Sequence, residues 1–244
     1  MTATLNRRPG TPGRPGTPGA ANATARAIVL PLCAILLLVL AGLAIAASPA
    51  VTAGDLAVIQ AIETARTPLL DAVALTDSVV FAPVGALVIV AAVSAFAWFG
   101  LRRPGAAFAF AALALLPWLG STVVKDIVRR PRPLSAALPH HVLTDTGFSF
   151  PSGHTSFAVA LGLALLIVFG RGRLRRPLLA FAVVVPLLTA FSRVYLGVHN
   201  PSDVLASLVY ATAAVLLVLA LLRRFAPAPV AAAVAVRASR TGGS

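Results

Sequence analysis

The chain has 244 residues, of which 59% belong to the apolar set and 11% are charged, and its mean hydropathy is +0.93. A soluble core does not need that much hydrocarbon, so the composition excludes a soluble domain and indicates a protein embedded in a membrane. The formal net charge is +13, and the single cysteine, Cys33, excludes an intramolecular disulfide.

The chain begins with a basic leader over residues 1–26, which contains the hexapeptide repeat RPGTPGRPGTPG. Four glycine triplets are too few for a collagen triple helix, so we predict that this leader is disordered and cytoplasmic. An uncharged run over 27–47 follows, ending near the small-residue stretch AIAASPA. A cleaved signal sequence would also explain this run, but its length and the long leader favour a retained helix.

Several more uncharged runs are long enough to cross a bilayer, because about 20 helical residues span the roughly 30 Å hydrocarbon layer. We therefore predict an all-α polytopic membrane protein with six transmembrane helices in one bundle, over 27–222, and a cytoplasmic tail over 223–244. Between the first two spans, 52–77 is predicted to form two short amphipathic helices at the outer interface, divided by Pro68. The six predicted spans are 27–47, 78–101, 104–124, 151–170, 177–192 and 204–222.

Basic residues are unevenly divided between the two sides of this predicted bundle. Alternating the six spans from an inside N-terminus places 14 of the 20 basic residues and none of the seven acidic residues on one side. The positive-inside rule assigns that side to the cytoplasm, so both termini are expected there, in a plasma-membrane protein. We attribute the net charge to this topology and expect no nucleic-acid partner. All four histidines fall on the outer side.

A basic cluster, KDIVRRPRP at 125–133, stands at the outer end of the third span. Lys125 is the only lysine, against nineteen arginines, which indicates that a compact ammonium group is required there. Four positive charges in eight residues also oppose the positive-inside bias, which favours a site for an anionic ligand. The alternative is an anchor for lipid headgroups.

Two more polar clusters begin the fourth and sixth spans. In FPSGHTS, Pro151 suits the first turn of a helix, whose free N–H groups would make an anion site with Ser152 and Gly153, and His154 follows. Alone, Pro-Ser-Gly is also an ordinary helix start. In the other cluster, the sequence Asn200-Pro201-Ser202-Asp203 predicts a helix N-terminus preceded by His199.

The carboxylate of Asp203 could accept a hydrogen bond from one imidazole nitrogen of His199 and leave the other nitrogen nucleophilic. The alternative makes Asp203 a capping charge and His199 an interfacial residue, but it leaves Arg193 unexplained. Together the clusters offer cations, a helix N-terminus and two histidines on one side, which fits phosphoryl transfer. The sequence contains no zinc ligand set or glycine-rich nucleotide loop, and its scattered acids make a two-metal site improbable, so no metal or other cofactor is expected.

The three clusters resemble the signature of a known family. Lys125 to Arg132-Pro133 matches K-x6-R-P, residues 151–154 match P-S-G-H, and Ser192-Arg193 with His199 and Asp203 matches S-R-x5-H-x3-D. In order and spacing this resembles the type-2 phosphatidic-acid phosphatase superfamily, which shares its site with glucose-6-phosphatase and the vanadium haloperoxidases. The signature covers about 80 residues, and the six-helix layout extends the likeness over 27–222.

The resemblance implies a role for each matched residue. His199 would attack phosphorus and become phosphohistidine, Asp203 would orient it, and His154 would protonate the leaving oxygen and later activate water. The phosphate would be held, without a metal, by Lys125, Arg132, Ser152, Gly153 and Arg193. The expected function is a lipid-phosphate phosphatase with an outward-facing site. The substrate stays open among phosphatidic acid, phosphatidylglycerophosphate and undecaprenyl diphosphate, and so do a phosphotransferase, a soluble-ester phosphatase and a non-catalytic headgroup-binding or transport protein.

Overall fold

The computed structural model describes residues 18–133, 138 and 147–235, and this part of the chain is helical, without strands. Helix α4 continues into a π-helical turn, η1 (Phe96–Gly100), and a 3₁₀ turn, Gly172–Leu174, precedes α7. The helices are α1 (Pro18–Ala46), α2 (Pro49–Glu63), α3 (Pro68–Val80), α4 (Pro83–Ala95), α5 (Pro104–Val128), α6 (Gly153–Phe169), α7 (Arg175–Tyr195), α8 (Pro201–Phe225) and α9 (Ala228–Ala233).

The all-α membrane architecture predicted from composition is confirmed. Five helical segments are long and apolar enough to cross a membrane: 22–46, 83–100, 104–128, 172–195 and 201–225. The remaining predicted span, 151–170, corresponds to α6, which is apolar but has only 17 residues. The sequence had indicated 177–192 as the short span. In the structure the helix there is longer at both ends, from Arg175 to Tyr195, and includes Arg193 in its last turn.

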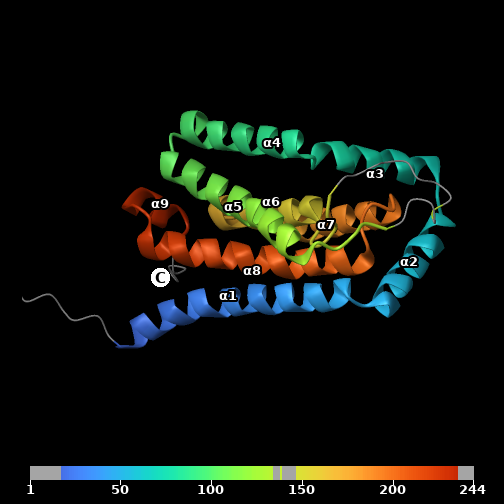
Figure 1. Cartoon of the computed structure of the whole chain (residues 1–244). Helices are drawn as coiled ribbons and strands as arrows, with labels where there is room; N and C mark the ends of the chain where they lie inside the picture. Colours follow the sequence, from blue (N-terminus) through green and yellow to red (C-terminus); the bar gives the residue numbers. More distant parts are fainter. Residues whose placement is uncertain (1–17, 134–137, 139–146, 236–244) are drawn as a thin grey trace, which may run out of the picture.

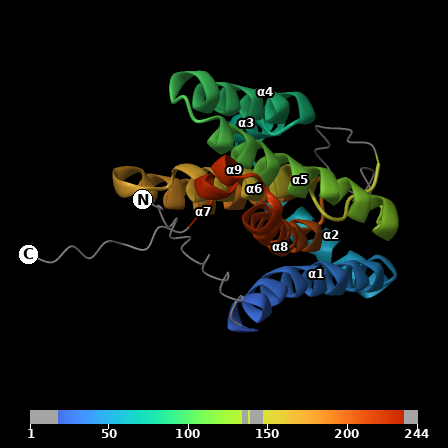
Figure 2. The ribbon, with the colours of Figure 1, turned by 90° about the vertical axis from the view of Figure 1, so that its left-hand side faces the viewer.

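Helix α6 lies at the centre of the bundle and packs against α5, α7 and α8, while α1 packs against α8 and α4 against α5. Figures 1 and 2 show α1 and α4 on opposite sides of this central group. The main core is formed around buried side chains such as Phe110, Phe157 and Val215. Large apolar side chains on the outer helices, such as Leu37 and Phe99, remain exposed, as expected for surfaces that face lipid.

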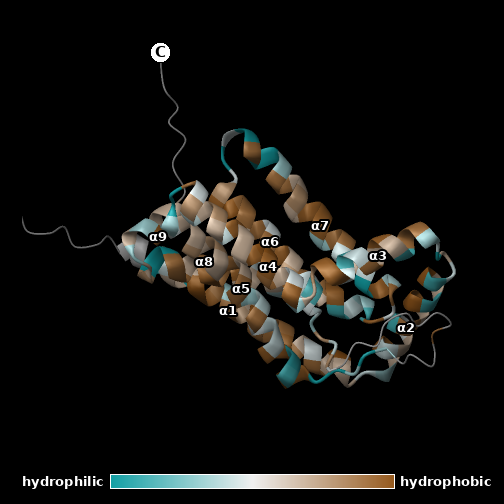
Figure 3. Ribbon diagram, turned by 90° about the horizontal axis from the view of Figure 1, so that it is seen from above, coloured by the Kyte–Doolittle hydropathy of each residue, from teal (hydrophilic) through white to brown (hydrophobic). Residues whose placement is uncertain are grey.

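The two ends of the bundle differ in their components. The start of α1, the turn between α4 and α5, and α9 lie at one end, whereas α2 and the connection between α7 and α8 lie at the other (Figure 1). Seen from above, brown apolar residues cover most of the helix lengths and teal residues are concentrated towards the ends (Figure 3). The arginine-rich segments at 102–103, 171–176 and 223–224, the last of them in the final turn of α8, lie at the α9 end.

Helices continue beyond both ends of the predicted set of spans. Helix α1 begins at Pro18, upstream of the predicted span 27–47, and residues 1–17 lie outside the described part. In the tail, α9 packs against α5 and α8. A Cβ added at Gly105 would lie 2.2 Å from the carbonyl oxygen of Pro229, so this close contact requires glycine. Two arginines also hold this end of the chain. Arg223 of α8 donates to the Val234 carbonyl, and Arg171, between α6 and α7, donates to the Ala233 carbonyl.

The two short helices predicted between the first spans are present as α2 and α3, and Pro68 is the first residue of α3. Each begins with proline after a capping hydroxyl, Ser48 for α2 and Thr67 for α3. The buried positions of α2 are Asp55, Ile59 and Glu63, so the side that meets the bundle carries two carboxylates. This helix therefore contributes polar contacts to the bundle, in addition to an apolar face.

Candidate active site

The basic cluster lies where α5 ends. Lys125 is in the last turn, and Arg129 ends the helix in the left-handed region at φ 53°. The Lys125 Nζ donates to the carbonyl oxygens of Phe148 (3.0 Å) and Ser149 (3.4 Å). Ser149 in turn donates from its backbone N to Arg130 O (2.8 Å) and from Oγ to the Pro131 carbonyl (2.9 Å). These contacts attach the segment before α6 to the end of α5.

The second cluster forms the start of α6. The helix begins at Gly153 with Ser152 as its N-cap, so Pro151 precedes the helix and does not lie in its first turn as predicted. The Ser152 Oγ accepts from Thr155 N at 3.4 Å. A Cβ added at Gly153 would lie 3.9 Å from the Lys125 Cε, so this glycine leaves space beside the lysine stem. The Nε2 of His154 lies 3.2 Å from the Ser78 carbonyl oxygen of α3.

The third cluster forms the start of α8, with Asn200 as N-cap and Pro201 as the first helical residue, as predicted. A turn through Gly197, at φ 68°, precedes it. The Asp203 Oδ2 accepts from the backbone N of Asn200 (2.8 Å) and from its Nδ2 (3.2 Å). The carboxylate is therefore fixed at the first turn, with its position determined by the helix start.

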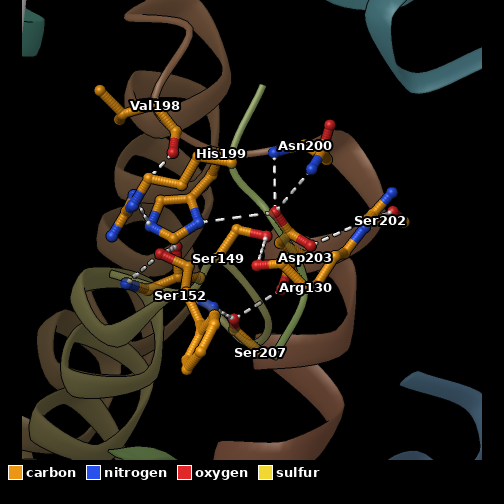
Figure 4. Close-up of polar contacts among 12 residues, drawn as sticks. Arg130, Ser149, Ser152, Val198, His199, Asn200, Ser202, Asp203 and Ser207 are labelled. Carbon is orange, nitrogen blue, oxygen red and sulfur yellow. Dashed lines mark hydrogen bonds and ion pairs between the residues drawn. The ribbon is translucent and has the colours of Figure 1, made fainter. Parts of the chain in front are cut away.

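His199 lies between Asp203 and Arg132 and is 1% exposed. Its Nδ1 is 3.6 Å from Asp203 Oδ2 (Figure 4), which is longer than a hydrogen bond. Its Nε2 is 3.2 Å from Arg132 Nη1. A guanidinium has only donors, so Nε2 must accept and carry the lone pair. The proton of the neutral ring is then on Nδ1, on the side of the carboxylate. This is the tautomer in which Nε2 is the nucleophilic nitrogen.

Burial is the main reason that the pKa of His199 falls to about 3, and the charges of Lys125 and Arg132 lower it further. Asp203 acts in the opposite direction but does not outweigh them. The imidazole is therefore neutral at ordinary pH, because its charged form would have to exist in a site that excludes water and already contains cations.

Arg193 is 1% exposed, at the end of α7. Its carbonyl oxygen accepts from Val198 N (3.2 Å) and His199 N (3.3 Å), so the arginine also shapes the loop that carries His199. Asp77 of α3 accepts a 2.7 Å hydrogen bond from Thr189 Oγ1. Burial raises the pKa of Asp77, and the nearby charge of Arg193 opposes that rise. Helix α3 thus brings an acid to this side of the site that the sequence did not indicate.

The structure connects the three clusters through residues that the sequence had not singled out. Ser207, fully buried one turn after Asp203, accepts from Ser152 N (2.7 Å) and donates to the Asp203 carbonyl (2.7 Å). Arg130 donates to Asp203 Oδ1 at 2.6 Å (Figure 4). In the sequence, the helical spacing of Ser207 after Asp203 is only a weak signal that the two residues contact each other. Arg130 lay inside the basic cluster, but the sequence did not indicate its partner.

Two comparisons of the sequence point to one family. Residues 104–227, which include all three clusters, match the family model described as "PAP2 superfamily". Undecaprenyl-diphosphatase BcrC of Bacillus subtilis is 43% identical over 82 residues, which cover 33% of this chain and 39% of that protein. A decaprenylphosphoryl-5-phosphoribose phosphatase of Mycobacterium tuberculosis is 38% identical over 84 residues, covering 34% and 43%. The matched part thus spans about two fifths of these curated relatives.

The fold has a counterpart among solved structures. A transmembrane PAP2-type phosphatidylglycerolphosphate phosphatase from Bacillus subtilis superposes with a TM-score of 0.63 and 24% sequence identity. The match covers 78% of this chain and 93% of that one. Similarity at this level of identity establishes a shared fold and says nothing about the substrate.

Proposed function

The chain belongs to the PAP2 superfamily, and from this premise we propose that it is a metal-independent membrane phosphatase that hydrolyses a lipid phosphate or diphosphate through a phosphohistidine at His199. The observation that carries the proposal is the environment of the imidazole. Its Nε2 bears the lone pair and lies 3.2 Å from Arg132 Nη1, which also donates to the Val198 carbonyl at 2.7 Å. The Arg132 guanidinium is a charged donor of the kind that holds phosphate oxygens. A phosphate bound to Arg132 would therefore be placed beside the nucleophilic nitrogen.

In the first step, Nε2 of His199 attacks phosphorus and the bond from phosphorus to the lipid oxygen breaks. Lys125, Arg132 and Arg193 neutralise the charge on the phosphoryl oxygens. The attacking ring becomes cationic, and the nearby carboxylate of Asp203 stabilises that charge and holds the Nδ1 proton. Lys125 and Arg132 lower the pKa of His199 in the free protein. The negative charge of bound phosphate offsets these cations, so the ring can become cationic when substrate is present.

His154 then acts on the leaving oxygen. Its Nε2 is held by the Ser78 carbonyl, so Nδ1 is the nitrogen that exchanges a proton with the reacting groups. The protonated ring gives its proton to the lipid alcohol or lipid phosphate as that group departs. In the second step His154 takes a proton from water, whose oxygen attacks phosphorus as the nitrogen–phosphorus bond breaks. The products are the lipid alcohol or monophosphate and inorganic phosphate.

A lipid substrate is favoured by the place of the site in the bundle. The His199 loop lies where α7 ends and α8 begins, at the ends of two segments long enough to cross a membrane. A lipid anchored in the bilayer would present its phosphate at this depth. The names of the curated relatives include an undecaprenyl diphosphatase and a phosphatidylglycerophosphatase, which supports undecaprenyl diphosphate and phosphatidylglycerophosphate as substrates to test. Phosphatidic acid is added to them as the third candidate from the sequence.

The competing functions differ in what they require of the site. A phosphotransferase or a phosphatase for a soluble ester would use the same residues, with another acceptor or a shorter leaving group. A non-catalytic protein that binds headgroups would need the cations but neither a neutral His199 nor its carboxylate. The buried His199–Asp203 pair therefore favours an enzyme over a binding protein.

The proposed orientation places the site outside the cell and both termini in the cytoplasm. It rests on the arginine-rich turns gathered at the end of the bundle opposite the His199 loop, and on the positive-inside rule. A Gly54→Cys change is suited to test the outer side, because a Cβ at Gly54 has nothing within 4 Å. In a Cys33→Ser background it should react with an impermeant maleimide on intact spheroplasts, whereas Arg173→Cys should react only after lysis. Reversed labelling would contradict the orientation but not the chemistry.

Release of inorganic phosphate by purified protein tests the function itself. Phosphatidic acid, phosphatidylglycerophosphate, undecaprenyl diphosphate and a soluble ester should be compared in mixed micelles, with His199→Ala as the matched inactive variant. We expect turnover of at least one lipid, abolished by the substitution. Faster release from the soluble ester, or phosphate transfer to an added alcohol in preference to water, would favour the corresponding alternative. Turnover by His199→Ala at the rate of the unmodified protein would refute the mechanism.

A further inference from the structure

A buried ion cluster lies on the side of Asp203 that faces away from His199. The Arg130 guanidinium, only 2% exposed, donates from Nη1 to Asp203 Oδ1 (2.6 Å) and Ser202 Oγ (2.6 Å). Its Nη2 donates to Asp55 Oδ2 of α2 at 2.7 Å. Figure 4 shows Arg130 reaching Asp203 between the starts of the helices that carry the site. One guanidinium thus lies between two carboxylates.

Asp55 also contacts the first turn of α8 directly. Its Oδ1 accepts from the backbone N of Ser202 at 3.1 Å, and its Oδ2 accepts from the Ser202 hydroxyl. A carboxylate on the free N–H groups of a helix start is stabilised by the helix dipole. Here that carboxylate comes from another helix, 147 residues earlier in the chain. Helix α2 is therefore fixed to the same turn that carries Asp203.

The two arginines of the RPRP segment act on opposite sides of His199. Arg132 contacts Nε2 of the imidazole, whereas Arg130 contacts the carboxylate that faces Nδ1. Only Pro131 separates them, in a segment without regular secondary structure. Successive side chains of an extended chain point in opposite directions, so residues two apart would be expected to share a side. The left-handed Arg129 and the two carbonyl contacts of Ser149 give this segment its different course.

The division of contacts on Asp203 is the key feature. Oδ1 is occupied by Arg130, and Oδ2, which accepts from Asn200, is the oxygen that faces His199 Nδ1. A fully buried carboxylate without a cationic partner would be costly to keep ionised. A neutral or rotated carboxyl group would no longer hold the Nδ1 proton in place. Arg130 touches neither the nucleophilic nitrogen nor the side of the ring where phosphate would bind.

We propose that Arg130, itself held by Asp55, is a positioning residue that keeps Asp203 ionised and aimed at His199. This proposal rests on the proposed function, since it assigns a role within the same reaction. It predicts a chain of contacts from Asp55 of α2 through Arg130 and Asp203 to His199. Of these four side chains, only His199 contacts the substrate. Loss of Arg130 should therefore slow phosphoryl transfer and leave substrate binding nearly unchanged.

The test is a double-mutant cycle between Arg130→Gln and Asp203→Asn, with phosphate release measured on the lipid that the unmodified protein hydrolyses. In the otherwise unmodified protein, Arg130→Gln should lower kcat by about 10- to 100-fold and change KM less than about threefold. In the Asp203→Asn background the same change should cost less than about threefold, because Arg130 acts through that carboxylate. Asp55→Asn and Arg130→Lys should give smaller losses in kcat.

Arg66→Gln is the matched control. Arg66 also joins the outer helices through an ion pair, at 2.8 Å to Asp71, but it does not contact Asp203. The activity of the Arg66→Gln variant should be close to that of the unmodified protein. Equal losses from Arg130→Gln in both backgrounds, a change in KM alone, or full activity would overturn the proposal. If Arg130→Gln, Arg130→Lys and Asp55→Asn all fail to elute as folded protein in detergent, the cluster is structural and the proposal is wrong. Inactivity of the unmodified protein on every lipid would instead refute the proposed function.

Discussion

Replacing Ser207 by alanine should separate two parts of the site that the sequence places 55 residues apart. The hydroxyl accepts from Ser152 N and donates to the Asp203 carbonyl, each at 2.7 Å, and the side chain is fully buried. Alanine cannot accept, so the buried Ser152 N–H loses its partner. Such a loss costs about 1–3 kcal/mol. For a chain of this size, each kcal/mol shifts Tm by about 2–4 °C, so we expect a fall of roughly 2–12 °C.

The same change should lower activity, because Ser152 begins the helix that carries Gly153 and His154. A displacement of about 1 Å between that helix start and His199 would cost up to about 100-fold in kcat. The assays are thermal unfolding in detergent, followed by the protein that remains soluble, and phosphate release at 25 °C.

Thr212→Val is the control for the loss of a hydroxyl on the same helix. The Thr212 Oγ1 also donates to a carbonyl four residues earlier, at 2.7 Å, but the side chain is exposed. Its Tm should change by less than about 2 °C and its activity should be unchanged. If Ser207→Ala behaves like Thr212→Val in both assays, the hydrogen bond between the two clusters does not support the site, and the reasoning fails.

Three further outcomes are expected. The first uses His154→Ala and p-nitrophenyl phosphate, whose leaving group needs no acid. The rate of phosphohistidine formation should be flat between about pH 5 and 8, because a pKa of about 3 keeps His199 neutral throughout. A tenfold fall in that rate per pH unit below about 6.5 would show that His199 titrates normally. Chelators should leave activity intact and vanadate should inhibit it, and activity lost in EDTA and restored by magnesium or zinc would reveal a required cation. Asp203→Asn should lower kcat by about 10²- to 10⁴-fold without abolishing it, through a misplaced imidazole, and an unchanged kcat would remove Asp203 from the mechanism.

Much of the site could be predicted because its residues lie in short local patterns. Asn200-Pro201-Ser202-Asp203 is a helix start by the chemistry of its side chains, and the structure begins α8 there. Ser152 also lies at a helix start, although as the N-cap and not within the first turn. The membrane helices followed from hydropathy, since lipid requires long apolar stretches whatever their partners.

The contacts between clusters could not be predicted, because they depend on how distant helices are placed and rotated. Asp55 is the clearest case. The local pattern of α2 indicated an amphipathic helix lying at the interface, and only the presence of Arg130, 75 residues later, makes a buried carboxylate favourable there. The same holds for Asp77, whose environment is set by α7. The sequence therefore indicated the proposed reacting groups, but not the residues that contact them from other helices.

The central claim is that His199 carries the phosphoryl group, and trapping the intermediate tests it most directly. The protein should be mixed with ³²P-labelled lipid phosphate and quenched in alkali, in which phosphohistidine survives and phosphoserine does not. We expect an alkali-stable, acid-labile label that maps to the peptide containing His199. The label should accumulate in His154→Ala, in which hydrolysis of the intermediate is slowed, and should be absent from His199→Ala. Label that persists in His199→Ala, or phosphate release with no labelled protein in either His154→Ala or the unmodified chain, would contradict the account.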